Sequence, residues 1–224
     1  MVNLRLKSKV TEWREIGSPP QEAFDWSKAR KNWCRDIPIH ENFIQSLPDS
    51  LSRNDVRQIT ESKKNTTAEK FVATMIWGYG DLGYGSYRVK KMFSTSGFQE
   101  RVDFSYDLAN DGKVLEAYEY LSKNRIQQLG PAFGTKWLSF ISPSSQPAPI
   151  YDSFIAMWIE KFARTEFAQT STSSEVWSKK TYSTYLEWML SNSKEFGLKP
   201  DDLELIIFQD ATQEFSTKSK WKEL

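Results

Sequence analysis

The amino-acid sequence predicts an all-α or mostly α fold. Apolar side chains recur at the spacing of amphipathic helices along most of the 224 residues, and no stretch shows a convincing alternation of β-branched side chains. Hydrophobic residues make up 39% of the chain and aromatic residues 14%, which is enough apolar surface for a compact core. This length allows either one large domain or two smaller lobes.

Turn and capping signals divide the N-terminal half into four expected helices. Pro19 and Pro20 stand where a helix can begin, because proline is tolerated in the first turn. Ser50 or Ser52 is a candidate cap for a short second helix. The expected helices cover residues 21–33, a stretch that ends at residue 61, residues 68–77, and residues 86–93 after a glycine-rich loop.

The C-terminal half is expected to be helical as well, apart from residues 98–104, whose pattern is ambiguous. A loop and then a helix are expected within residues 107–128, and Pro200 is expected to open the last helix. The remaining expected helices cover residues 135–141, 153–167, 176–196 and about 200–210.

Cysteine and histidine are nearly absent, which restricts the possible chemistry. Cys34 is the only cysteine, so an internal disulfide framework, a cysteine-rich zinc site and a four-cysteine iron–sulfur cluster are excluded. His40 is the only histidine, which makes a histidine-based metal centre improbable. We therefore expect no metal and no cofactor, and catalysis by Lys, Asp, Glu, Tyr or backbone groups.

Charge and hydropathy give weaker constraints. The formal net charge of +1 argues neither for nor against a nucleic-acid partner. The N-terminal segment lacks the apolar run of a signal peptide, and no stretch approaches the roughly 18 apolar residues of a membrane span. The expectation is a soluble, intracellular protein.

The most informative stretch is residues 125–141. Its pattern predicts a helix that ends at Leu129, a turn rich in glycine and proline, and a second helix that opens at Thr135. Unpaired N–H groups at such a helix start suit a DNA phosphate, and Gly134 would let the phosphate approach the backbone. Lys136 would lie in the first turn, where the helix dipole disfavours a cation and so favours an uncharged, nucleophilic amine. The alternative interpretation is a solvated surface lysine.

A carboxylate follows Lys136 after sixteen residues. Asp152 stands directly before a strongly apolar helix, so it is expected to cap that helix. A routine cap is one interpretation of this residue. The other is that the two helix starts lie side by side and bring the amine and the carboxylate together.

Two motifs in this region resemble the helix-hairpin-helix DNA glycosylase superfamily, especially its 8-oxoguanine DNA glycosylase branch. That family carries a Leu-Pro-Gly-Val-Gly-Thr-Lys hairpin, followed by Pro-Val-Asp at the head of a helix. The first motif is matched by residues 131–136 and the second by residues 149–152, with one residue inserted before Asp152. Ala132 replaces the first hairpin glycine, and the interval from lysine to aspartate is a few residues short. The resemblance covers about residues 115–165.

The resemblance implies a fold, a reaction and a partner. The fold would be a single two-lobed helical domain over residues 1–224, with the active site between the lobes and the catalytic core at about 115–165. The target nucleotide would be flipped out of double-stranded DNA into a pocket. Lys136 would attack the sugar C1′ with assistance from Asp152, and the Schiff base could allow strand nicking. No cofactor is needed. A monomer in the cytoplasm, associated with the nucleoid, is expected.

Further site candidates have two interpretations each. The resemblance and the local pattern assign DNA contacts to four groups, whereas the alternatives are core packing, a solvated face or a frayed end. The hairpin group is Pro131, Ala132, Phe133, Gly134 and Thr135, and the base-pocket or stacking candidates are Trp77, Tyr79, Tyr84, Phe208 and Gln209. The phosphate candidates are Arg88, Lys90 and Lys91. A candidate DNA-contacting tail is formed by Lys218, Lys220 and Lys222 around Trp221.

Two other functions remain open at this point. One is a catalytically silent DNA-binding module that kept the hairpin, and the other is a helical interaction protein without a nucleic-acid role. Within the enzyme hypothesis the excised base could be 8-oxoguanine, another damaged base, or a modified base in foreign DNA, which would make the chain a defence protein.

Overall fold

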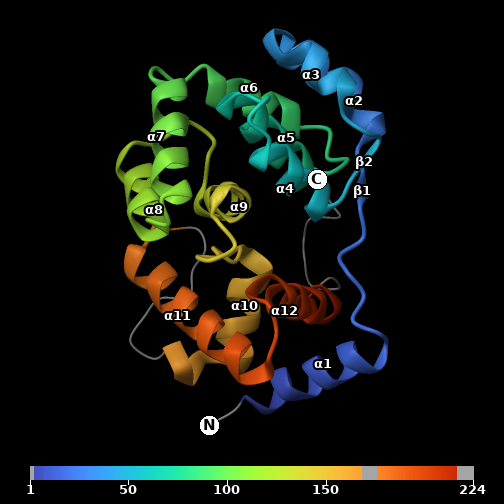
Figure 1. The fold of residues 1–224 in the computed structure, drawn as a ribbon, viewed down its shortest axis with the longest axis vertical. Coiled ribbons are helices and arrows are strands. Elements are labelled where there is room, and N and C mark those ends of the chain that lie inside the picture. The colour runs from blue at the N-terminus through green and yellow to red at the C-terminus, as the bar shows by residue number, and fades with distance from the viewer. Residues whose placement is uncertain (1–2, 168–175, 216–224) are drawn as a thin grey trace. The chain divides into compact units, whose positions relative to one another are not determined.

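The computed structural model describes residues 3–167 and 176–215, and they are mostly α-helical (Figure 1). These residues form twelve α-helices, three 3-10 helices and one antiparallel pair of two-residue strands. The predicted mostly α class is therefore confirmed. The candidate tail around Trp221 lies outside the described residues.

Contacts within the chain divide it into two compact units, which are described separately. The central unit comprises Gln21–Ala148, and the terminal unit comprises the residues up to Pro20 together with those from Pro149 onward. Lys136 belongs to the central unit and Asp152 to the terminal unit.

The central unit is built around helix α9, Pro131–Ile141. Figure 1 shows α9 nearly end-on, and four other helices of the unit, α4, α5, α7 and α8, pack against it. The other elements are β1 (Phe24–Asp25), η1 (Ser27–Ala29), α2 (Arg30–Asp36), η2 (Pro38–His40), α3 (Glu41–Ser46), β2 (Ser50–Leu51), α4 (Arg53–Glu61), α5 (Thr67–Tyr79), α6 (Gly85–Phe93), α7 (Phe98–Asn110) and α8 (Val114–Lys123).

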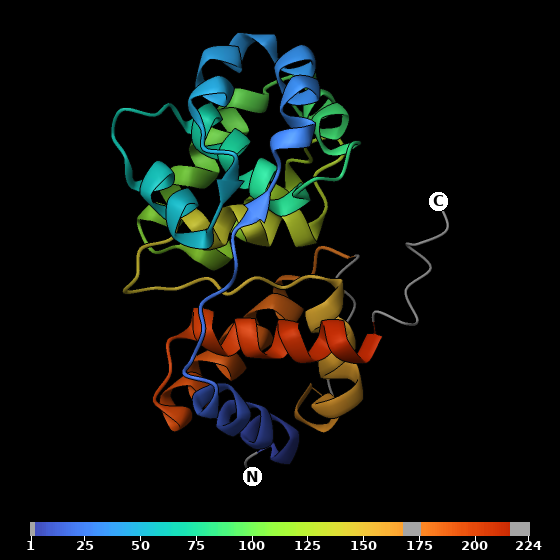
Figure 2. The same ribbon diagram turned by 90° about the vertical axis from the view of Figure 1, so that its right-hand side faces the viewer.

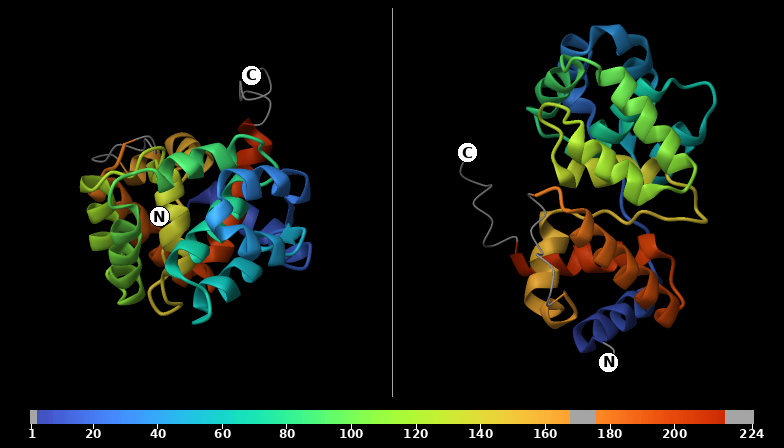
Figure 3. Two further views of the ribbon diagram at one scale, coloured as in Figure 1. Left: turned by 90° about the horizontal axis from the view of Figure 1, so that it is seen from above. Right: turned by 90° about the vertical axis from the view of Figure 1, so that its left-hand side faces the viewer.

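One side chain of α9 fixes its position in this core. Trp137 is fully buried, and its ring meets the ring of Phe71 on α5 edge-on at 5.3 Å. Its indole N–H donates a hydrogen bond to the Ser105 hydroxyl of α7 at 3.0 Å. A buried indole needs such a partner, so Trp137 sets both the depth and the rotation of α9. The neighbouring helices α7 and α8 lie side by side in Figure 3.

Of the two predicted cap candidates, Ser50 and Ser52, the structure confirms Ser52. Ser52 caps α4 and Thr66 caps α5, each through a capping box that an acidic residue closes. The helix expected over residues 21–33 is wrong at its start: Phe24 and Asp25 pair with Leu51 and Ser50, and helical structure begins only at Ser27. The ambiguous segment at residues 98–104 belongs to α7.

The terminal unit contains α1 (Leu4–Glu15), α10 (Ser153–Phe162), η3 (Arg164–Phe167), α11 (Lys179–Phe196) and α12 (Pro200–Phe215). Helix α12, red in Figure 2, packs against α1, α10 and α11. Three expected boundaries are wrong: α10 ends at Phe162 instead of Phe167, the helix expected from residue 176 begins at Lys179, and α12 continues beyond residue 210. Ala163 leaves the helical conformation, with φ −128°, and this ends α10.

A buried carboxylate joins three of these helices. Asp210 of α12 accepts two hydrogen bonds from the Arg5 guanidinium of α1, at 2.6 and 2.8 Å, and one from the Trp158 indole of α10 at 2.8 Å. Burial alone would raise the pKa of Asp210, but the hydrogen bonds and charges of Arg5, Trp158 and Lys9 outweigh it, and the pKa is lowered. A charged Asp210 therefore holds α1, α10 and α12 together.

Candidate active site

Lys136 lies in the second turn of α9, not in the first turn as the sequence pattern indicated. The helix begins at Pro131, because Gly130 takes the N-cap position and the Gly134 amide already donates to the Gly130 carbonyl at 2.9 Å. Proline fits the first helical position, so the Gly-Pro pair starts the helix instead of forming the turn. The argument from the helix dipole therefore loses its basis at Lys136, because that effect falls off within the first turn.

The turn between α8 and α9 lies earlier in the chain than expected. Helix α8 ends at Lys123, and Gln128 turns the connection with a positive φ of 67°. The Gln127 amide donates to the Thr95 hydroxyl at 3.0 Å, which fixes the connection to the segment before α7. The five hairpin candidates, residues 131–135, are thus the first residues of α9. The N-cap residue Gly130 has no side chain that could cap α9. The amides in the first turn of α9 therefore keep the geometry that suits an anion.

A glycine of α5 makes room for the Lys136 side chain. Lys136 is half-buried, and its Nζ lies 5.4 Å from the centre of the Phe133 ring. A Cβ atom on Gly78 would lie 2.9 Å from the Phe133 ring and 3.2 Å from Cδ of Lys136. At Gly78 the groups that approach the helix backbone are therefore Phe133 and Lys136 of the same unit.

A chain of ring contacts leads from the lysine to the surface of the central unit. Phe133 stacks on Tyr79 at 4.1 Å, and Tyr79 meets Tyr84 edge-on at 5.9 Å. Tyr79 is buried, and burial raises the pKa of its phenol to about 12. Tyr84 is 41% exposed and lies under the guanidinium of Arg88, at 4.9 Å. Successive contacts thus link Lys136, through Phe133, to Tyr79, Tyr84 and Arg88.

The other candidates of this unit are Trp77, Lys90 and Lys91. Trp77 is buried between Phe24 and Phe140, at 5.7 and 4.9 Å, which is the core position given above as the alternative. Lys90 is exposed on α6, and Lys91 lies 5.5 Å from the ring of Tyr87. The sequence did not single out Tyr87, although it is 55% exposed beside these cations.

Asp152 caps α10, as its position in the sequence predicted. One carboxylate oxygen accepts the backbone N–H groups of Phe154 and Ile155, at 3.1 and 3.2 Å. The residue is 9% exposed and extended, with φ −110° and ψ −175°. The carboxylate is therefore held in a defined position at the positive end of the helix dipole.

Phe208 and Gln209 of α12 are half-buried in the same unit. The Phe208 ring meets the ring of Phe154 edge-on at 5.7 Å. Because Phe154 also donates its amide to Asp152, Phe208 lies close to the capped start of α10. The structure thus groups the lysine with Tyr79, Tyr84 and Arg88 in the central unit, and Asp152 with Phe208 in the terminal unit.

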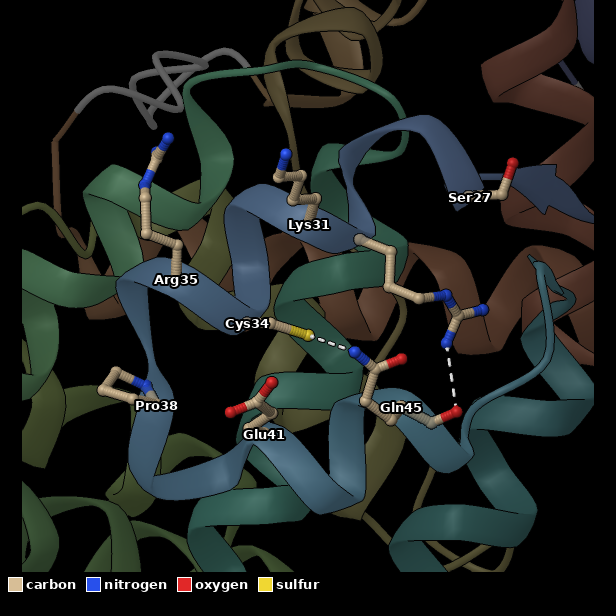
Figure 4. A pocket seen from close by; sticks show the side chains of 8 residues that line it. Ser27, Lys31, Cys34, Arg35, Pro38, Glu41 and Gln45 are labelled. Carbon is tan, nitrogen blue, oxygen red and sulfur yellow. Dashed lines mark hydrogen bonds between the residues drawn. The ribbon is translucent and has the colours of Figure 1, made fainter.

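A hollow of about 570 Å³ between α2 and α3 is a separate feature of the central unit (Figure 4). Its interactions are structural. Arg30 donates to the carbonyl oxygens of Ile44 and Leu47 at the end of α3, and the Gln45 amide donates to the Cys34 sulfur at 3.3 Å. Burial raises the pKa of the Cys34 thiol, which disfavours the nucleophilic thiolate. We therefore do not place catalysis in this hollow.

Residues 3–167 and 176–215 contain no group of three or more His, Cys, Asp or Glu side chains that could hold a metal ion. In the same part of the chain, none of the helices combines the length and the apolar character that crossing a membrane requires.

The mostly helical fold and the helix-capping Asp152 are compatible with the helical DNA glycosylases that residues 131–152 resemble. A comparison with protein families supports this class. It matches residues 17–208 to the family described as "Putative 8-oxoguanine DNA glycosylase OGG-like protein". Because the match spans most of the sequence, the chain belongs to this OGG-like family, and its class of activity is that of a DNA glycosylase with DNA as substrate. Searches of curated proteins and of solved structures found no match.

Proposed function

We propose that the protein excises an oxidised or otherwise modified base, 8-oxoguanine or a similar base, from double-stranded DNA, with Lys136 as the nucleophile. One observation carries the proposal: the OGG-like match covers residues 17–208 and so includes both Lys136 and Asp152. The structure supports it with a half-buried lysine packed against Gly78 and Phe133, and with a buried carboxylate fixed at a helix start.

In the proposed reaction the uncharged Nζ of Lys136 forms a bond to C1′ of the flipped nucleotide. The bond between C1′ and the base nitrogen breaks, and its electron pair leaves with the base, which takes up the proton that the amine loses. The C1′–O4′ bond then breaks and the sugar ring opens, O4′ takes up the second proton that the amine loses, and a Schiff base forms between Nζ and C1′. Removal of a C2′ proton then expels the 3′ phosphate by β-elimination and nicks the strand. An enzyme that also nicks the strand in this way is bifunctional, and one that only releases the base is monofunctional.

Asp152 has an electrostatic role in this proposal. Its negative charge would stabilise the positive charge that develops on the sugar, and it would assist the deprotonation of Lys136. Such stabilisation is strongest when the charged group is fixed in advance and shielded from water. The two hydrogen bonds from the start of α10 and the low exposure of Asp152 meet both conditions.

Other residues would bind the DNA. The start of α9, at residues 131–135, would hold a phosphate through the amides of Ala132 and Phe133, because Pro131 has no N–H and the Gly134 amide donates to the Gly130 carbonyl. Arg88, Lys90 and Lys91 would be further phosphate contacts. Tyr84 is exposed and only two ring contacts from Phe133, so it suits stacking on a flipped base or filling the gap that the base leaves. Phe208 and Gln209 are candidates for the base pocket, whereas the burial of Trp77 and Tyr79 favours a supporting role for them.

Borohydride trapping tests the proposal. The protein would be incubated with duplexes that contain 8-oxoguanine, other modified bases, an abasic site or no lesion, and sodium borohydride would reduce any Schiff base to a stable adduct. A covalent adduct on a lesion duplex supports the enzyme, and the array identifies the base. Salt-dependent duplex binding without adduct or base release would support the silent DNA-binding module. Absence of DNA binding would support an interaction protein.

Gly78→Ala is expected to lower the excision rate about tenfold or more, since small misplacements of a reacting group cost large factors in rate. The added methyl would overlap the Phe133 ring and displace the side chain of Lys136. Alanine is intrinsically favoured over glycine inside a helix by about 1 kcal/mol, so stability should change less than activity. Single-turnover base release and thermal melting measure the two effects.

Gly83→Ala is the matched control, because a Cβ atom at Gly83 meets nothing within 4 Å. A Gly78→Ala protein with the rate of the wild type would contradict the placement of Lys136 in the reaction.

A further inference from the structure

An extended segment leads into α10 in the terminal unit, and its residues Ile150 and Tyr151 are each only 2% exposed (Figure 2). Backbone carbonyl groups in a buried, extended segment need hydrogen-bond donors from elsewhere in the protein. The identity of those donors bears directly on Asp152, which follows Tyr151 in the chain.

Two tyrosines of α11 supply these donors. The phenol of Tyr185 donates to the Ile150 carbonyl at 2.7 Å, and the phenol of Tyr182 donates to the Pro149 carbonyl at 3.2 Å. Residues three apart lie on the same face of a helix, so the two phenols reach successive carbonyl groups of the segment. Both side chains are fully buried, and the Tyr185 ring contacts the ring of Tyr151 at 4.6 Å.

The backbone of Asp152 is therefore held on both sides. Before Asp152, the phenols of Tyr182 and Tyr185 fix the carbonyl groups of residues 149 and 150. After it, the amides of Phe154 and Ile155 bind its carboxylate. An N-cap needs only the second set of hydrogen bonds. The first set adds a restraint on where the start of α10, and with it the carboxylate, is placed.

The phenol of Tyr185 is suited to act as a permanent donor. Burial raises its pKa well above the usual value of 10.0, and the nearby carboxylate of Glu204 raises it further, followed by smaller contributions from Tyr182, Asp152 and Tyr151. The phenol accordingly stays protonated at and around neutral pH. Its hydrogen bond to the Ile150 carbonyl does not depend on pH in that range.

We propose that Tyr182 and Tyr185 are positioning residues, which act through the backbone of residues 149 and 150 to place the Asp152 carboxylate for base excision. This inference rests on the proposed function of Asp152. Partners that orient a functional group without touching the substrate typically change activity by about 10- to 100-fold when they are removed. A purely structural role would instead lower stability without a specific effect on the chemical step.

The test uses the full-length protein with Tyr185→Phe and Tyr182→Phe, which remove one phenolic oxygen each. The excision rate at saturating 8-oxoguanine duplex is expected to fall about tenfold for Tyr185→Phe, as for other orienting partners, with an unchanged Kd for the duplex. Hydrogen exchange at the amides of Phe154 and Ile155 is expected to become faster. Ser193→Ala is the matched control, because it removes a buried hydroxyl-to-carbonyl hydrogen bond of 2.7 Å from the same helix.

A double-mutant cycle separates positioning from general destabilisation. If Tyr185 acts through Asp152, Tyr185→Phe will cause no further loss of rate in an Asp152→Asn background. The same tenfold loss in both backgrounds would overturn the proposal. So would unchanged hydrogen exchange at residues 154 and 155, or an equal loss of rate in Ser193→Ala.

The exchange measurement needs no activity, which keeps two failures apart. If the wild type excises no base, the proposed function fails. The exchange rates at Phe154 and Ile155 then still decide whether the two tyrosines hold the start of α10.

Discussion

Replacing Lys136 with glutamine is expected to abolish the borohydride-trapped adduct and to lower base excision by about a thousandfold or more, since loss of a nucleophile removes the covalent route. Glutamine has a similar length but no amine that could attack C1′. Folding should be preserved, because the lysine is only half-buried and its Nζ lies over the Phe133 ring, a type of contact that contributes roughly 0.5–1 kcal/mol at exposed sites. Gel analysis of trapped complexes and single-turnover base release provide the measurements.

Lys113→Gln is a suitable control for the loss of one positive charge. Its side chain is 52% exposed on the surface of the central unit, at an ion-pair distance of 3.5 Å from Asp111. An exposed pair of this kind contributes little to stability. If Lys136→Gln still forms the adduct, the nucleophile is another amine and the assignment of Lys136 is wrong.

The sequence predicted the fold class and several helix starts because these depend on local interactions. Ser52 and Asp152 cap the helices that follow them, and a cap needs only a side-chain oxygen and amides two or three residues away. The short strand at Phe24 was missed, since its partner Leu51 is distant in sequence and a two-residue ladder leaves no periodic pattern.

Positions within the candidate site were harder to predict. The start of α9 was placed at Thr135 because Gly130 and Pro131 were assigned to the turn, whereas proline is compatible with both a turn and the first helical position. Sequence spacing alone could not identify Phe133 and Lys136 as the groups that contact Gly78. Signals that depend on packing between helices are not contained in local patterns.

The tyrosines of α11 show the same limit. Tyr182 and Tyr185 have the three-residue spacing of a buried helix face, which the sequence alone assigns only to the core. Their phenols have hydrogen-bond partners 33 and 35 residues away. Both residues of this expected buried face are tyrosines, and each carries a hydroxyl group. That is the one signal that could have indicated such partners, since a buried phenol usually donates to an acceptor.

Asp152→Asn is expected to lower the excision rate by about 10²- to 10⁴-fold while leaving the protein folded, as is typical when a group that assists proton transfer loses its charge. Asparagine is as good an N-cap as aspartate, so its side-chain oxygen can still accept the amides of Phe154 and Ile155. The substitution therefore removes the charge and keeps the cap. Single-turnover base release and the melting temperature separate the two contributions.

Two further variants decide whether the cap or the charge matters. Asp152→Ala removes both the cap and the charge. Its excision rate should be as low as that of Asp152→Asn, and its stability should fall by about 1 kcal/mol, the usual cost of a lost cap. Ser178→Ala removes a cap from α11, where the Ser178 hydroxyl accepts the Thr181 amide at 3.1 Å, and should lower stability by a similar amount with little change in rate. A fully active Asp152→Asn protein would show that Asp152 is only a cap, because the one property that distinguishes it from asparagine is the negative charge that the reaction is proposed to use.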